Sequence, residues 1–283
     1  MSGTIQQNRT GILLAALALG VTVIAQAGDN PTSRIHYLGN AGVMAEHGET
    51  RILFDPLFQE DYNEYELVPP DMQRALLAGA APWDGVDAVF VSHYHEDHFD
   101  PALILAYLKA HPAIELYAPA QAALGLHEAA SPADAGIFGR VHGLALAYGD
   151  APLRIEMGGL LIEALFIPHS GWPGSNTEVE NLAFRVTLDN VTTVTHLGDA
   201  DGDVVHFAGS AAYWEQRRTH LALPPYWFFY GADKGSDLLH GLNTDRAVGV
   251  HVPKNVPDES GARPAELQGI DLLTRPGESR DIP

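Results

Sequence analysis

The segment 93–98 combines three imidazoles with two carboxylates, in the order His-Tyr-His-Glu-Asp-His. On extended backbone, residues two apart point to the same side, so His93 and His95 can reach one metal ion together. Asp97 and His98 lie where the chain leaves an apolar run, and they can turn toward a second ion. Imidazoles and carboxylates are common ligands of divalent metals. We therefore interpret the segment as a metal site; the alternative is a solvated loop that happens to contain histidines.

The same segment is expected on a loop between a strand and a helix. The apolar run 86–92 precedes it and is typical of a short buried strand. Asp100 followed by Pro101 is typical of a helix N-cap with proline at the first helical position. A loop held at both ends by regular elements keeps its side chains in a fixed arrangement, which suits chemistry.

The pattern H-x-H-x-D-H resembles the signature of the metallo-β-lactamase-fold hydrolases. That family's other landmarks are single residues, each at the end of an apolar run, and they follow here in the expected order. The resemblance spans about residues 34–254. The further landmarks are Asp55, His169, Asp199 and His251.

The resemblance implies two divalent metal ions that share a hydroxide, which attacks an ester, lactone or phosphodiester bond. Zinc is expected because the chain has no cysteine and its candidate ligands are nitrogen and oxygen, with manganese and iron as alternatives. Asp97 and Asp199 are the candidate catalytic residues. By carry-over from the family pattern, the first ion is held by His93, His95 and His169, the second by Asp97, His98 and His251, and both by Asp199.

Three further residues are assigned to supporting roles around the ions. Asp55 is expected to accept a hydrogen bond from a ligand imidazole and fix its orientation, although a local turn would also account for it. Trp172 and Asn181 are weaker candidates for the substrate pocket, because they lie within and just after the Gly/Pro loop that follows His169. Residues 56–83 read as an irregular insert that either walls the pocket or packs on the surface.

Composition excludes several classes of function. The chain has 283 residues, enough for one large domain, and a formal charge of −20. This charge disfavours nucleic acid as a substrate, since affinity for nucleic acid rests on Lys and Arg. The absence of cysteine excludes disulfides and thiolate catalysis. The chain also lacks the G-x-S-x-G motif of serine hydrolases.

The two ends of the chain are predicted to lie outside the catalytic domain. Residues 1–27 read as a signal peptide, with Arg9 before an apolar stretch. Cleavage is expected after Ala27, which predicts a periplasmic or secreted protein without a stable membrane anchor; an uncleaved anchor is the alternative. Residues 28–256 are then the metallo-hydrolase domain. Residues 257–283 are rich in proline and charge, and we expect a loosely attached polar tail there.

The order of the expected elements, strands, then helices, then strands and helices again, predicts an α+β protein. A meander of three short strands is expected over 34–55, and two hairpins turn at Gly158-Gly159 and Asp189-Asn190. The resemblance implies a four-layer αββα sandwich of two mixed sheets with helices outside, and a metal site at one edge. Helices are expected over 71–78, 101–110, 121–129 and 208–218, and further strands over 86–92, 114–118, 221–229 and 249–252.

Within the family, the turn over 39–42 and the short segment 168–171 resemble a branch of ascorbate-phosphate lactonase-like and N-acylphosphatidylethanolamine phospholipase D-like proteins. This likeness implies an exported hydrolase that acts on a lactone or phosphodiester of a small-molecule or lipid-like substrate. Hydrolysis of β-lactams is one alternative, because the protein is expected to be exported. A non-catalytic metal-binding protein on the same fold is the other, and the oligomeric state stays open.

Overall fold

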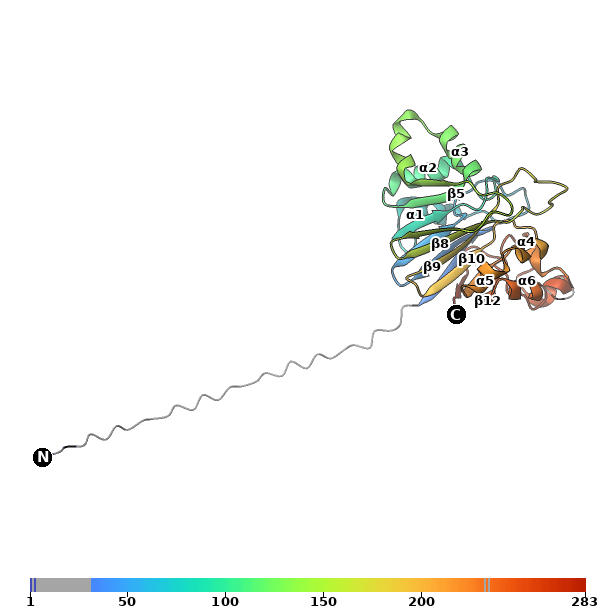
Figure 1. The fold of residues 1–283 in the computed structure, drawn as a ribbon. Helices are drawn as coiled ribbons and strands as arrows, with labels where there is room; N and C mark the ends of the chain where they lie inside the picture. The colour runs from blue at the N-terminus through green and yellow to red at the C-terminus, as the bar shows by residue number, and fades with distance from the viewer. Residues whose placement is uncertain (2, 4–31, 232, 234) are drawn as a thin grey trace. The chain divides into compact units, whose positions relative to one another are not determined.

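Two mixed β-sheets hold the strands of this chain (Figure 1). The predicted signal peptide over 1–27 lies outside the described residues, apart from two isolated positions near its start. The computed structural model describes Met1, Gly3, 32–231, 233 and 235–283.

The first sheet has seven strands in the order β13-β1-β2-β3-β4-β5-β6. Pairing is antiparallel from β13 to β3 and parallel from β3 to β6. The predicted meander over 34–55 is confirmed, since β1, β2 and β3 pair in chain order. The strands are β1 Ser33–Gly39, β2 Gly42–His47, β3 Thr50–Phe54, β4 Val86–Phe90, β5 Glu115–Pro119, β6 Val141–Leu144 and β13 Ser279–Asp281.

The second sheet has six strands in the order β12-β11-β10-β9-β8-β7. Both predicted hairpins are present, β7 with β8 and β9 with β10. Asp189 and Asn190 both adopt positive φ, which a tight two-residue hairpin turn requires. The strands are β7 Leu153–Met157, β8 Leu160–Phe166, β9 Leu182–Leu188, β10 Thr192–His196, β11 Thr219–Leu223 and β12 Thr244–Ala247.

The helices expected over 71–78, 101–110 and 121–129 begin within one residue of where the sequence predicts. The single helix expected over 208–218 is wrong, because two short helices, Val205–Ala208 and Ala211–Glu215, stand in this region. Asp100 is the N-cap of α2, because its Oδ1 accepts a hydrogen bond of 2.8 Å from the backbone N–H of Leu103. None of the described helices combines the length and apolar content that crossing a membrane requires. The helices are α1 Pro70–Ala78, α2 Pro101–Ala110, α3 Ala120–Ala129, α4 Val205–Ala208, α5 Ala211–Glu215 and α6 Ser236–Gly241, with 3₁₀ helices η1 Pro132–Arg140, η2 Tyr226–Phe229, η3 Ser260–Ala262 and η4 Ala265–Leu267.

Three apolar cores define four layers, which confirms the predicted αββα sandwich. The central core lies between the sheets and joins Phe54 and Phe90 of the first to Phe184 of the second. A second core packs α1, α2 and α3 on the outer face of the first sheet. A third packs α4, α5 and α6 on the outer face of the second sheet, as Figure 1 shows. Each sheet therefore buries both faces, and its functional side chains gather at strand ends.

Two predicted strands are wrong in part. Residues 226–229 form a 3₁₀ helix rather than the end of a strand over 221–229. Pro224 and Pro225 explain this, because proline has no N–H to continue the pairing of β11. The strand expected over 249–252 is also absent. Its neighbour β12 ends earlier, and the following backbone pairs only at isolated positions.

The prediction of a loosely attached tail over 257–283 is wrong. Leu267, Leu272 and Leu273 are at most 2% exposed, and Leu273 belongs to the central core. Strand β13 extends the first sheet by pairing with β1. The high content of proline and charge hides short apolar anchors, which are enough to hold this segment against the fold.

Candidate metal centre

The candidate metal ligands lie after the ends of strands, at one edge of the two sheets. The segment 93–98 follows β4, His169 follows β8, Asp199 follows β10 and His251 follows β12. Loops at the ends of strands are where sandwiches of this kind collect functional side chains. We call the seven residues that meet there the His/Asp cluster: His93, His95, Asp97, His98, His169, Asp199 and His251.

The ligand atoms of the His/Asp cluster fall into three overlapping groups. Within each group, one atom per residue lies within 4.8 Å of the others. Two of the groups are those that the family pattern assigns to the two ions, and the third joins them through Asp199. The groups are His93, His95 and His169; Asp97, His98 and His251; and His93, His98 and Asp199.

Asp199 touches both halves of the cluster with its two carboxylate oxygens. Its Oδ2 lies 3.4 Å from His169 Nε2 and 3.2 Å from His251 Nε2. Its Oδ1 lies 3.2 Å from His98 Nε2. One carboxylate therefore reaches the imidazoles of both halves, as a bridging ligand must.

Several ligand atoms in this cluster have no hydrogen-bond partner although they are buried. They are Nε2 of His98, Nε2 of His169 and Oδ1 of Asp199. A buried polar atom without a partner is costly, so such atoms at one point indicate a missing partner. Imidazole nitrogen with carboxylate oxygen is a donor set that suits divalent zinc, manganese or iron. The residues present therefore fit divalent metal binding.

Burial and charge set the ionisation of the cluster. Burial, with His98 close by, holds the pKa of His93 well below its usual range, so this imidazole is neutral and able to bind a metal. Burial opposes ionisation of Asp199, but His251 and His98 outweigh it and hold the pKa of that carboxyl well below its usual range. Within the described residues, every ion pair of Asp97 and Asp199 is made to a histidine. The negative charge there is thus available to cations.

Asp55 makes the hydrogen bond that the sequence predicts. Its Oδ2 lies 2.9 Å from His98 Nδ1, which leaves Nε2 of that imidazole facing the cluster. Ser92 holds the carboxylate from the other side, donating from its N–H over 2.7 Å and from its hydroxyl over 2.6 Å. Asp55 is fully buried and adopts φ of 41°, so its position is fixed by the surrounding contacts. Such a partner orients a metal ligand and fixes its tautomer.

Two supporting contacts are not predicted by the sequence. Asn40 donates from Nδ2 to the carboxylate of Asp97 over 3.1 Å and to its carbonyl over 3.0 Å. The carbonyl of Ser170 lies 2.9 Å from His169 Nδ1 and directs Nε2 of that ring toward Asp199. The only local signal for Asn40 is its position in a turn between two glycines, which indicates a turn former and not a partner of Asp97.

The two candidate pocket residues differ in outcome. The expectation that Asn181 faces the substrate is wrong, because its side chain is fully buried and both ends of its amide are bonded to backbone. Its Nδ2 donates to the carbonyls of Ile167 and Leu197, and its Oδ1 accepts from the N–H of Asp199. Asn181 therefore positions the loop that carries Asp199. Trp172 is 36% exposed and stays a candidate for substrate contact.

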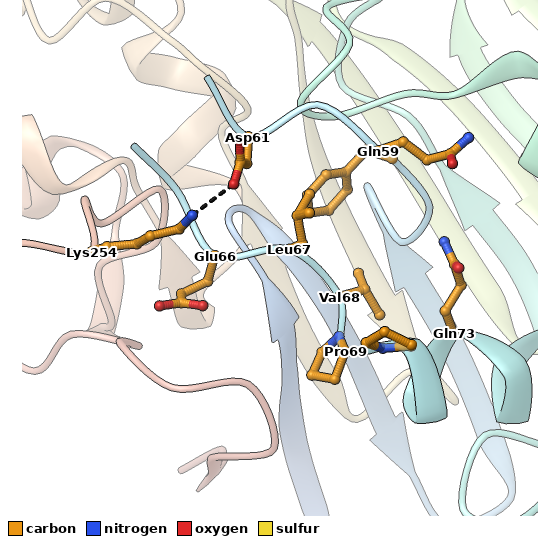
Figure 2. Close-up of a pocket in the computed structure, with 10 residues that line it drawn as sticks. Gln59, Asp61, Glu66, Leu67, Val68, Pro69, Gln73 and Lys254 are labelled. Carbon is orange, nitrogen blue, oxygen red and sulfur yellow. Dashed lines mark hydrogen bonds and ion pairs between the residues drawn. The ribbon is translucent and has the colours of Figure 1, made fainter. Parts of the chain in front are cut away.

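The insert over 56–83 lies against the His/Asp cluster. The ring centroid of Tyr65 is 4.1 Å from that of His251. An ion pair of 2.7 Å joins Asp61 to Lys254, three residues after that histidine, as Figure 2 shows. The backbone N–H of Lys254 also donates to the carbonyl of Glu64 over 2.8 Å. Of the two alternatives left by the sequence, the insert therefore forms a wall of the centre.

Comparisons with known proteins show which family this chain is similar to. The model of a family described as beta-lactamase superfamily domain matches residues 50–217. A protein of Mycobacterium tuberculosis is 25% identical over 253 residues, which cover 87% of this chain and 98% of that protein. A protein of Opitutus terrae named as a metal-dependent hydrolase is 29% identical over 230 residues, or 78% of this chain and 86% of that protein. The structure of an isothiocyanate hydrolase from Delia radicum gut bacteria has the same fold, with a TM-score of 0.55 at 16% identity and coverage of 87% and 98%.

Proposed function

The chain belongs to the beta-lactamase superfamily, and from that premise we propose that it is a metal-dependent hydrolase with a centre for two divalent ions. The observation that carries the proposal is the set of buried, unpartnered ligand atoms of His98, His169 and Asp199. Such ions would supply a nucleophile derived from water at neutral pH and would polarise the bond under attack.

The residues of the chain have distinct tasks in this proposal. Asp199 carries the charge that both halves of the cluster share, since its two oxygens contact imidazoles of each. We propose that Asp199, which is ionised at rest, accepts the proton that the attacking water releases and passes it to the leaving group. Asp97 adds a second negative charge, and Asn40 holds its carboxylate in place. Asp55 keeps Nε2 of His98 directed at the centre.

The proposed substrate is a small or lipid-like molecule with an ester, lactone or phosphodiester bond. The all-nitrogen-and-oxygen donor set supports zinc first, with manganese and iron as alternatives. Zinc is a strong Lewis acid with no redox chemistry of its own, which suits hydrolysis. Fold and donor set support the reaction class and leave the choice among these bonds to experiment.

The first test of this proposal measures metal content and activity together. The purified protein is loaded separately with zinc, manganese and iron(II), its metal content is measured by mass spectrometry, and each form is assayed on esters, lactones, phosphodiesters and β-lactams. We expect two equivalents of metal and turnover of an ester, lactone or phosphodiester, both reduced in His95→Ala. The exposed Asp71→Asn variant, whose side chain is 91% exposed, is the matched control. Two equivalents without turnover of any compound would favour a non-catalytic metal-binding protein.

Export is a separate part of the proposal. The apolar stretch and the Ala25-Gln26-Ala27 site support a cleavable signal over 1–27. Expression of the full chain in a bacterium with a periplasm should give an exported form whose intact mass begins at Gly28. Recovery of the uncleaved chain in the membrane fraction would favour the anchor instead.

A further inference from the structure

The His/Asp cluster is exposed to solvent mainly at one residue. His95 is half-buried, whereas His93 and His98 are fully buried and the other four members are at most 6% exposed. A substrate must contact the ions, so it has to approach on the side of His95. The surface around this imidazole is therefore where the structure can select a substrate.

A hollow of about 330 Å³ opens beside His95. Its apolar walls come from three separate parts of the chain: Tyr62 of the insert, Tyr94 and Phe99 near the metal loop, and Gly125 of α3. Its volume falls within the range of small-molecule sites, roughly 300–1,000 Å³. We call it the His95 pocket. The hollow of about 400 Å³ in Figure 2 is lined by residues of the insert together with Lys254, and by none of the seven cluster residues.

Gly125 keeps space in the His95 pocket. It lies inside α3, where glycine is less favourable than alanine, so its presence there has a cost. A Cβ at this position would stand 3.6 Å from Cε1 of Phe99, an ordinary contact, and its backbone is not in the left-handed region. Alanine would thus be accommodated, whereas a longer side chain would extend into the hollow.

The polar groups of the pocket limit what can bind. Gln121 is occupied, because its amide donates to the carbonyl of Glu178 over 3.2 Å and accepts from the N–H of Glu180 over 3.1 Å. Glu96 contributes a carboxylate to the lining. A substituent with negative charge would be repelled there, whereas an uncharged alkyl or aryl group would be buried against aromatic rings.

We propose that the His95 pocket binds an uncharged apolar substituent of the substrate, next to the bond that is hydrolysed, and that Gly125 sets the largest group accepted. The proposal rests on the proposed function, because it places the reacting bond at the cluster. It narrows the substrate class to esters, lactones or phosphodiesters that carry a medium-length alkyl chain or an aryl group.

The test measures binding rather than turnover. Straight-chain alkyl hydroxamic acids, from two to ten carbons, bind metals through their head group and present a tail of variable length. Calorimetric titration of the zinc-loaded full chain should show affinity rising about fourfold per methylene, until the pocket is filled. In Gly125→Leu, the shortest compounds should bind as before, whereas the longest should lose tenfold or more. Gly136→Leu is the matched control, because Gly136 is exposed and has no atom within 4 Å of an added Cβ.

A second pair of measurements tests whether the His95 pocket disfavours a negatively charged substituent. Hydroxamic acids with a terminal carboxylate should bind more weakly than alkyl compounds of equal length, and Glu96→Gln should narrow that difference. Affinity that is independent of tail length, or equal affinities of wild type and Gly125→Leu for every tail, would contradict the proposed role of the His95 pocket but not the proposed hydrolysis. Tail-dependent binding without turnover of any ester, lactone or phosphodiester would contradict hydrolysis but not the role of the pocket. If no hydroxamate of any length binds the zinc-loaded protein, both proposals fail together.

Discussion

Two buried groups of charged side chains, one around Arg185 and one in the His/Asp cluster, differ in how far the ionic groups themselves are hydrogen-bonded. In the second sheet, Arg185 donates to Glu163 over 2.8 Å and 3.1 Å, and its other N–H groups reach the backbone carbonyls of Tyr213 and Trp214. Its guanidinium also lies over the ring of Tyr213, 4.0 Å from the centroid. In the His/Asp cluster, by contrast, ligand atoms are buried with no partner.

The difference separates a structural network from a binding site. Arg185 and Glu163 satisfy each other, although Nε of Arg217 and Nε1 of Trp214 nearby are buried without hydrogen-bond partners. The pair therefore stabilises the packing of the second sheet on its helices. The His/Asp cluster places like groups together and leaves donor atoms unused, which is stable only with a further partner. Burial and charge alone would not distinguish the two groups. What differs is that the unpartnered atoms of the His/Asp cluster are ligand atoms that converge, whereas those beside Arg185 are N–H donors.

The largest effect on stability should come from breaking the structural pair. Arg185→Met leaves the buried Glu163 carboxylate with only its longer contact to Arg217, of 3.5 Å, and we expect the free energy of unfolding to fall by about 3–5 kcal/mol. The double variant Arg185→Met/Glu163→Met should recover most of this loss, since apolar side chains of similar size can replace a buried pair. Denaturant unfolding measures both. Both variants should hold as much metal at low temperature as the wild type. Loss of metal from the double variant would show that the Arg185–Glu163 pair and the His/Asp cluster are not independent.

A substitution inside the His/Asp cluster should affect chemistry more than the fold. Asp199→Asn removes the charge that both halves of the cluster share, and we expect kcat/KM to fall by roughly 10²–10³-fold. The metal content should fall below two equivalents. Thermal unfolding of the metal-free variant should shift to lower temperature, because it lacks the charge that pairs with His98 and His251 in the folded state. Retention of full activity would show that Asp199 is not part of the centre.

A smaller loss of function is expected from Asp55, which contacts a candidate metal ligand and is not one itself. Asp55→Asn keeps an acceptor for Ser92 but weakens the hydrogen bond that fixes His98 Nδ1. Loss of such a partner weakens metal affinity by about 10–100-fold. Competition with a chromophoric chelator measures this. If affinity is unchanged, Asp55 serves only the local turn.

The smallest effect on stability should come from three partly exposed side chains that contact one another, His36, Glu46 and Arg51. Burial raises the pKa of Glu46, but hydrogen bonds from His36 and Arg51 outweigh it and lower the pKa below its ordinary value of 4.5. The folded state therefore gains stability above pH 4.5, and this gain is lost as the pH falls through the lowered pKa. We expect Glu46→Gln to cost about 0.5 kcal/mol near neutral pH, and this cost should shrink as the pH falls below 4.5 and vanish once Glu46 is protonated in the folded state. A cost that does not shrink as the pH falls would point to packing instead.

The sequence predicts the members of the His/Asp cluster because each is marked locally. His169, Asp199 and His251 end apolar runs, and strand ends on one edge of a sandwich meet in space. The family pattern then supplies their grouping. For the same reason the two hairpins and α2 are predictable, since Asp189-Asn190 and Asp100-Pro101 are turn and cap signals that act over a few residues.

The contacts that the sequence does not predict are set by tertiary structure. Asn40 meets Asp97 across 57 residues of chain, and no spacing connects them. Asn181 lies in the expected loop, but its amide turns inward because three buried backbone groups need partners there. The apolar anchors Leu272 and Leu273 are too few to indicate a packed segment within a charged stretch.

The pairing of β13 with β1 has a consequence for synthesis of the chain. Strand β1 is the earliest described strand to leave the ribosome, and its outer neighbour β13 is the last. Until translation has finished, the free edge of β1 exposes unpaired N–H and C=O groups that can pair with another copy. A chain that stops before Ser279 would keep all seven members of the His/Asp cluster and still leave this edge open. Premature termination there would therefore promote aggregation more than it impairs the centre.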